Sequence, residues 1–235
     1  MNISDVVRLL EAAGSEQTRK TYRRHGVTAP LYGVRYADLH KLVKQVGVDR
    51  ELSESLWATG NHDCRVMATM VADAGLIKAS TLDAWARQID NHVLIDSFAN
   101  LAARSRNGRR RAERWMSAKR EWLAATGWHT LAVLAGDTFD VFSADELAKY
   151  IDRIEAELHT SPNRVRHEMN QALICIGVRT PALEKRALAA AKRLGKVEVD
   201  HGQTSCQTRD AADYIKKTLA YRRKTKTKGR KRTGC

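Results

Sequence analysis

The sequence is poor in proline and cysteine and has no long apolar run. Three prolines in 235 residues, with frequent Ala, Leu, Lys, Arg and Glu, favour a helical protein. The four cysteines lie far apart without a CxxC or Cys/His pair, which is typical of free thiols in the reduced cytoplasm. No stretch approaches the ~18 apolar residues of a membrane span. Because Walker, GxGxxG and zinc-binding patterns are absent too, neither a cofactor nor a metal is expected.

Positive charge is abundant and concentrated near one end of the chain. The formal net charge is +14, and ten Lys and Arg residues with no acid lie between Lys216 and Arg232, which leaves about +4 for the other residues. We therefore predict one folded domain over 1–220 and a basic, disordered tail over 221–235. Such a tail suits DNA, RNA or an acidic membrane surface equally well, so charge alone names only the class of partner.

Apolar residues recur at helical spacing along nearly the whole chain, and the predicted helices are joined by short connections. Helical pairs follow one another about every 35–45 residues, which predicts an all-α solenoid; a compact irregular bundle is the alternative. A short strand is predicted only at Lys196–Val199. The predicted helix-terminal residues are Asn61, Ser143 with Glu146, Ser161-Pro162, Thr180-Pro181, Gly195 and Thr208.

The segment 90–104 is the most informative stretch. At helical period, Leu94, Ile95, Phe98, Leu101 and Ala102 share one apolar face, and Asp96 lies opposite with His92 and Asn100. Five arginines follow closely, at positions 104, 106, 109, 110 and 111. A carboxylate beside dense positive charge suits a polyanion held by the cations and acted on by Asp96. An ordinary solvated aspartate is the alternative.

Two further clusters have structural interpretations that we favour. Asp200-His201 with Cys206 suits a metal or nucleophile site, but its turn residues favour a loop that caps the last helix. His62-Asp63 suits an acid–base pair, but its place beside the cap Asn61 favours a structural hydrogen bond. Among the tryptophans, Trp85 and Trp115 fall on apolar stripes and are predicted in the core, while either Trp122 or Trp128 borders a groove.

Ordered short motifs from about residue 30 to residue 217 resemble the AlkD-like DNA alkylation repair family. The matching strings are Gly33-Val34-Arg35, Leu56-Trp57, His62-Asp63-x-Arg65-x-x-Ala68, Trp85, Asp90-Asn91, Asp96-Ser97, Ala112-x-x-Trp115, Glu121-Trp122, Asn163-x-Val165-Arg166, Asn170, Ala172-Leu173, Ile176-Gly177 and Val197–Ile215. The resemblance implies a curved solenoid of about six HEAT-like helical pairs whose basic concave face holds duplex DNA. It also implies hydrolysis of the glycosidic bond of N3- or N7-alkylpurines without a cofactor.

Carried over by position, the resemblance places the catalytic carboxylate on Asp96. The family's first cleft Trp falls on His92, its Arg on Ala125 and its second Trp on Gln171, so three supporting groups are replaced. Losing the aromatic walls removes stacking of about 1–3 kcal/mol per base. Losing the arginine removes a phosphate contact of about 1.5–3 kcal/mol. We expect the remaining DNA contacts at His92, Trp122, Gln171, Arg104, Arg106, Arg109, Arg110, Arg111 and Arg166.

Three hypotheses follow for the function. The first is an alkylpurine DNA glycosylase centred on Asp96, with activity weakened or lost through the replaced groups. The second is a non-catalytic binder of bent, branched or damaged DNA on the same scaffold, which those replacements favour. The third is a protein-binding helical scaffold. For the DNA-binding hypotheses we expect a monomer in the cytoplasm, associated with the nucleoid and with no membrane partner.

Overall fold

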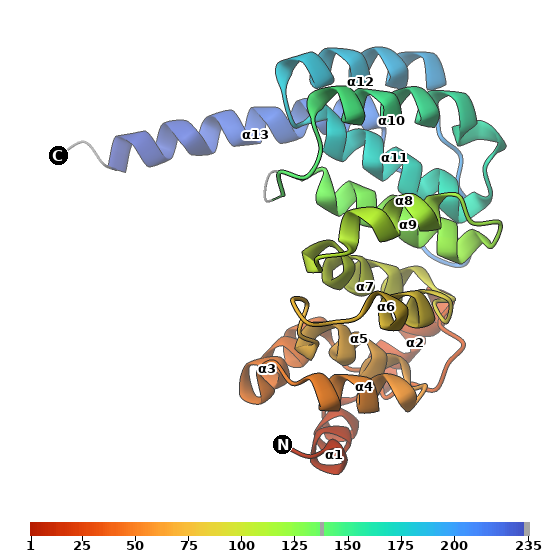
Figure 1. Ribbon diagram of the computed structural model, residues 1–235, viewed down its shortest axis with the longest axis vertical. Helices are drawn as coiled ribbons and strands as arrows, with labels where there is room; N and C mark the ends of the chain where they lie inside the picture. Colours follow the sequence, from red (N-terminus) through yellow and green to blue (C-terminus); the bar gives the residue numbers. More distant parts are fainter. Residues whose placement is uncertain (137–138, 233–235) are drawn as a thin grey trace. The chain divides into compact units, whose positions relative to one another are not determined.

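The computed structural model describes residues 1–136 and 139–232, and the regular structure in them is entirely helical. The described residues form thirteen α-helices and one short 3-10 helix (Figure 1). The prediction of an all-α protein is confirmed. The predicted strand at Lys196–Val199 is wrong, because the segment after Gly195 forms no ladder with any other described segment.

The chain divides into two compact units, which we describe separately. Unit 1 comprises residues 1–130 and 200–206, and unit 2 comprises residues 131–199 and 207–235, of which 137–138 and 233–235 lie outside the described residues. The helices that lie in unit 1 or begin there are α1 (Ile3–Ala13), α2 (Glu16–Arg24), α3 (Tyr36–Val46), α4 (Arg50–Ala58), α5 (His62–Val71), α6 (Ala79–Ala86), α7 (His92–Arg104), α8 (Gly108–Met116) and α9 (Glu121–Leu134). The remaining helices are α10 (Ala144–Glu157), the 3-10 helix η1 (Leu158–Thr160), α11 (Asn163–Gly177), α12 (Pro181–Leu194) and α13 (Ala211–Arg232).

The predicted division at residue 220 falls inside α13. This helix continues through Arg232, where the sequence predicted a disordered tail from 221 onward; the last three tail residues lie outside the described residues. A run of Lys, Arg and Thr has enough helix propensity to extend a helix that tertiary contacts have already started. One domain over 1–220 stays a prediction.

Most predicted helix ends are confirmed by hydrogen bonds from side chains. Asn61 accepts the amide hydrogens of Asp63 and Cys64, and Ser143 forms a capping box with Glu146. Thr180 caps α12 ahead of its proline. Two predicted caps are wrong. Ser161 instead donates to the carbonyl of Glu157, since α11 begins at Asn163, and the last helix is capped by Asp210 and not by Thr208.

The core of unit 1 is rich in indole rings. All five tryptophans of the chain lie in this unit. Trp57 and Trp85 stack with ring centroids 4.3 Å apart and an interplanar angle of 1°, and Phe98 packs between Trp57 and Trp115. The predicted core positions of Trp85 and Trp115 are confirmed. This packing fixes α7, which carries Phe98, against α4, α6 and α8.

Unit 2 is built around α11, which packs against α10, α12 and α13. In Figure 1, α10, α11 and α12 lie side by side in this unit. Leu173 and Ile176 of α11 are fully buried, and Gly177 leaves room for Ile215 of α13, whose Cδ1 lies 2.6 Å from where a Cβ would be. A Cβ at this position would also lie 2.8 Å from Ala187 Cβ of α12, so a residue larger than glycine would force the neighbouring side chains to shift.

Candidate functional site

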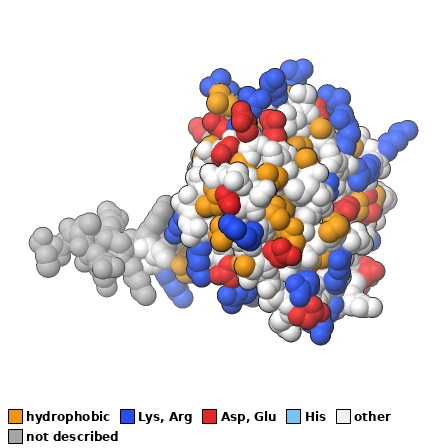
Figure 2. All heavy atoms as spheres, turned by 90° about the horizontal axis from the view of Figure 1, so that it is seen from below, with side chains coloured by type: hydrophobic (Ala, Val, Ile, Leu, Met, Phe, Trp, Pro, Cys, Tyr) orange, Lys and Arg blue, Asp and Glu red, His pale blue; other side chains and the backbone are white. Residues whose placement is uncertain are grey.

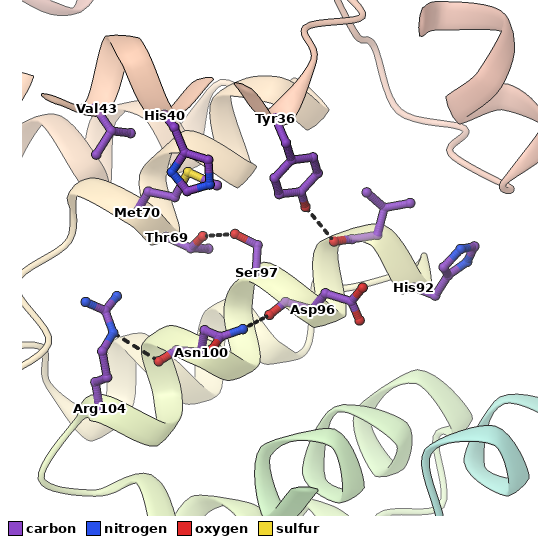
Figure 3. A pocket seen from close by; sticks show the side chains of 11 residues that line it. Tyr36, His40, Val43, Thr69, Met70, His92, Asp96, Ser97, Asn100 and Arg104 are labelled. Carbon is purple, nitrogen blue, oxygen red and sulfur yellow. Dashed lines mark hydrogen bonds between the residues drawn. The ribbon is translucent and has the colours of Figure 1, made fainter. Parts of the chain in front are cut away.

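A groove in unit 1 contains the carboxylate that the sequence singled out. Its volume is about 500 Å³, and α3, α5 and α7 line it (Figure 3). Helix α7 supplies His92, Asp96, Asn100 and Arg104 along one side, and Tyr36 and His40 enter from α3. The lining therefore combines the Asp96 carboxylate and the Arg104 guanidinium with imidazole, amide and phenol groups, and Val43, Met70 and Val93 add apolar surface.

Helix α7 orients Asp96 because its other face is buried. Leu94, Ile95, Phe98 and Leu101 are at most 1% exposed, as predicted from their spacing, whereas the Asp96 side chain is 58% exposed. Asn91 caps the helix by accepting the amide hydrogen of Leu94. The carboxylate is therefore held by a rigid, well-packed helix and open to solvent.

His129 of α9 lies beside Asp96. Its Nε2 lies 3.6 Å from Asp96 Oδ1, and its side chain is only 17% exposed. Sequence reasoning missed this residue, although a signal was present. His129 lies seven residues after Trp122 and four after Ala125, so the three share roughly one side of α9.

Two imidazole rings, those of His25 and His92, lie close together at the start of α7. His25 Nδ1 and His92 Nε2 are 3.2 Å apart, and the two rings are tilted by 60°. His92 therefore contacts another side chain of the protein and is also a lining residue of the groove. Nearby, the Tyr36 hydroxyl donates to the Val93 carbonyl at 3.2 Å. Burial and the negative charge of Asp96 raise the pKa of Tyr36, so its phenol remains protonated.

The loop before α3 is anchored by a buried carboxylate. Asp63 Oδ2 accepts the amide hydrogens of Tyr32 and Gly33 at 2.7 and 3.0 Å, and Oδ1 accepts that of Val34 at 2.9 Å. Gly33 has a φ of 79°, and a Cβ there would lie 2.6 Å from Arg19 Cγ. The structural role predicted for Asp63 is confirmed: it positions the loop that leads into Tyr36.

His62 is also structural. Its ring is buried against Tyr22 at a centroid distance of 5.2 Å, and neither ring nitrogen has a hydrogen-bond partner among the described residues. Burial lowers the pKa of His62 to about 4, so the imidazole is neutral at physiological pH. A neutral, enclosed imidazole without partners has no access to a substrate.

The arginines after α7 do not form one patch. Arg104, Arg106 and Arg110 are exposed, while Arg109 pairs with Glu113. Arg111 is buried and pairs with Asp83, which also accepts from the Trp115 indole. The prediction of Arg111 as a DNA contact is wrong, because the helical period of α8 turns it inward. On the face shown in Figure 2, Lys and Arg side chains lie among Asp and Glu side chains.

The aromatic borders predicted on α9 differ in accessibility. Trp128 is fully buried and cannot border a groove, whereas Trp122 is partly exposed. Ala125, the position onto which the resemblance carries the family's arginine, is also fully buried. Among the described residues that line the groove, none is tryptophan.

The remaining predicted site residues belong to unit 2. Arg166 and Gln171 both lie on α11 and are partly exposed. Gln171 Oε1 accepts from Arg209 Nη1 at 3.4 Å, and Arg209 precedes α13. Sequence reasoning missed Arg209, since a residue in a loop carries no periodic signal. The role of Arg166 and Gln171 in binding DNA stays a prediction.

The loop that contains Asp200, His201 and Cys206 has the hydrogen bonds of an ordinary turn. In the loop at 200–206, Asp200 accepts the amide hydrogen of Gly202 and Thr204 donates to the His201 carbonyl, as in an ordinary turn. In the described part of the chain, no group of three or more His, Cys, Asp and Glu residues is close enough to hold a metal ion. None of the described helices combines the length and apolar character needed to cross a bilayer.

Comparison with known proteins gives consistent matches along the chain. A family model described as "DNA alkylation repair enzyme" matches residues 6–215. The uncharacterized protein Lin0241 of Listeria innocua is 25% identical over 214 residues, covering 88% of this chain and 93% of that protein. The uncharacterized protein Lmo0209 of Listeria monocytogenes is 26% identical with the same coverage.

A solved structure matches with a TM-score of 0.87 and 28% identity, over 94% of this chain and 95% of the other. It is described as belonging to "a new family of proteins related to the HEAT-like repeat DNA glycosylases with affinity for branched DNA structures". This match confirms the predicted fold of HEAT-like helical repeats.

Proposed function

Because this chain belongs to the DNA alkylation repair enzyme family, we propose that it binds branched or distorted DNA through the sugar–phosphate backbone. The observation that carries the proposal is the composition of the unit 1 groove. An exposed carboxylate lies there among imidazoles and one arginine, with no tryptophan among the described lining residues. The affinity for branched DNA of the protein with the matching structure supports the same function.

The groove is poorly equipped to hold a damaged base. A base in an enzyme pocket is usually stacked between aromatic side chains, and each such contact contributes about 1–3 kcal/mol. Tyr36 is the one Phe, Tyr or Trp among the described lining residues, and its hydroxyl is bound to Val93. Without a stacking wall, recognition through backbone charge and DNA deformability is the better match to these residues.

Cations near the groove can contact phosphates. Arg104 lies at the end of α7 with Nε donating to the Asn100 carbonyl, which leaves its terminal nitrogens for a ligand. Two exposed arginines, Arg106 and Arg110, follow Arg104 closely in the sequence. Such contacts are independent of sequence and strongly dependent on salt.

Glycosylase activity is the second candidate function, because of Asp96. It is exposed, and it occupies the position that the resemblance assigns to the catalytic carboxylate. A carboxylate there can stabilise the positive charge that develops on the sugar as the bond to a cationic alkylpurine breaks. His129, at 3.6 Å, is placed to orient it.

The two functions predict different effects of Asp96→Asn: stronger DNA binding for the binder, and loss of base release for the glycosylase. If phosphates enter the groove, the carboxylate repels them by about 0.6 kcal/mol at 7 Å in water, so the substitution strengthens binding about threefold. Fluorescently labelled four-way junctions and duplexes of matched sequence measure this by anisotropy. If the protein is a glycosylase, duplex containing N7-methylguanine loses free base with the wild type and much less with Asp96→Asn.

The proposal of DNA binding requires the wild type to prefer the junction over the duplex and to lose affinity as salt is added. Absence of affinity for either DNA would refute it and would favour the protein-binding scaffold. A preference for alkylated DNA, the monomeric state and the cytoplasmic, nucleoid-associated location stay predictions.

A further inference from the structure

Unit 2 contains a cluster of side chains that the proposed function has not used. We call it the Arg209 cluster, and it consists of Arg209, Gln171 and Tyr214. The Arg209 guanidinium lies 4.4 Å from the centroid of the Tyr214 ring, and its Nη1 is 3.4 Å from Gln171 Oε1. The backbone carbonyl of Arg209 accepts a hydrogen bond of 2.9 Å from Asn170 Nδ2. Helices α11 and α13 therefore both hold this exposed residue.

Arg209 differs from several other arginines of unit 2 because no salt bridge to a carboxylate holds it within the described residues. Five of them pair with an acid, as in Arg164–Glu168, Arg153–Glu157, Arg179–Asp140, Arg186–Asp152 and Arg193–Glu155. In the described part of the chain, Arg209 forms no such salt bridge, and the neighbouring Asp210 is engaged as the cap of α13. Its positive charge is therefore not neutralised by a partner.

A second arginine, Arg222, acts electrostatically on the same part of α11. Burial raises the pKa of the Cys175 thiol, and the hydrogen bond from Gln171 and the charges of Arg209 and Arg222 oppose that rise. Both arginines therefore lie near the same thiol on α11. Arg222 itself donates to the Val178 carbonyl at 2.9 Å. Of these two arginines, Arg209 is the one that contacts Gln171.

We propose that the Arg209 cluster binds a phosphodiester group of the DNA backbone, with Arg209 as the direct contact and Tyr214 and Gln171 as positioning residues. This inference rests on the proposed function and adds a contact in unit 2. A guanidinium that stacks on an aromatic ring has lost most of its side-chain freedom before the ligand arrives, so binding a phosphate costs less entropy. The planar fork then offers paired donors to the phosphate oxygens.

The test measures binding of the full chain to a labelled four-way junction between 50 and 200 mM salt. Arg209→Gln should weaken binding about five- to tenfold, and the slope of log K against log salt should become shallower by about one. Arg209→Lys should keep the slope and recover part of the affinity, because the charge remains and the fork is lost. Tyr214→Leu should weaken binding with the slope unchanged, because only the preorganisation is removed.

Arg186→Gln is the matched control. Arg186 is an exposed arginine of the same unit, but Asp152 holds it at 2.6 and 2.7 Å, so its removal should leave junction affinity within about twofold of the wild type. Thermal melting of each variant confirms that it is folded. Wild-type affinity in Arg209→Gln, an unchanged slope in that variant, or an equal loss in Arg186→Gln would overturn the inference while the proposed function stands. Failure of the wild type to bind any DNA would overturn both.

Discussion

Replacing Asp63 by Asn tests how the fold positions the unit 1 groove. The carboxylate accepts three backbone amide hydrogens, from Tyr32, Gly33 and Val34, and is fully buried. An amide of the same size keeps one oxygen, so it can replace Oδ2 with its two hydrogen bonds. Its NH2 group then faces the Val34 amide hydrogen, and a donor meets a donor.

The expected destabilisation follows from these contacts. An unsatisfied buried donor costs about 1–3 kcal/mol, and the two remaining hydrogen bonds lose their charge assistance. Removing a buried charge offsets part of this loss. We expect Asp63→Asn to lower the free energy of unfolding of unit 1 by about 3 kcal/mol. In a chain of this length, that change lowers the melting temperature by about 6 to 12 °C.

Guanidinium titration followed by circular dichroism measures this change. Asp5→Asn is the control, because the Asp5 carboxylate forms an exposed pair with Arg8, and the substitution should change stability by less than about 0.5 kcal/mol. A wild-type midpoint in Asp63→Asn would show that the carboxylate does not anchor the loop. The reasoning would equally fail if the variant were destabilised but the loop ahead of Tyr36 kept its wild-type protection from hydrogen exchange.

Three further predictions concern titration and charge. In the folded protein the pKa of His62 is about 4, whereas in the unfolded chain it is near 6.5, so the unfolded chain binds the proton first as pH decreases. The free energy of unfolding therefore falls through this window, by about 2 kcal/mol at pH 5. His62→Leu should remove that decrease in urea titrations. Arg111→Gln should lower the free energy of unfolding by about 3 kcal/mol and leave the salt dependence of DNA binding unchanged. Arg106→Gln should leave stability unchanged and make the salt dependence of DNA binding shallower. Removing residues 226–235 deletes five cations, so junction affinity should fall and its salt slope should become shallower without loss of binding.

Much of the fold was predictable, because its signals are local and periodic. The apolar stripe of α7, the caps Asn61 and Thr180 and the capping box at Ser143 all follow from side-chain spacing and short-range hydrogen bonds. The errors also have local causes. Ser161 and Thr208 are good capping residues by type, but the actual helix starts depend on tertiary packing of α11 and α13.

The candidate site was predictable only in part. Asp96 was identified because one helix carries both its exposed face and its apolar face. Arg111 was misplaced because charge density in a sequence does not say which arginine turns inward to meet Asp83. His129 contacts Asp96, which lies 33 residues earlier, and Arg209 contacts Gln171, which lies 38 residues earlier. Helical spacing indicates which residues share a face, but it does not say which distant residue that face contacts.

The confinement of every indole to unit 1 has a practical consequence. Intrinsic fluorescence excited at the red edge of protein absorption reports on unit 1 alone, since unit 2 contributes no emitter of that kind. The parallel rings of Trp57 and Trp85 should also give coupled near-ultraviolet bands that vanish when they separate. A label placed in unit 2 would then allow the order in which the two halves of the chain lose structure to be resolved in a single sample.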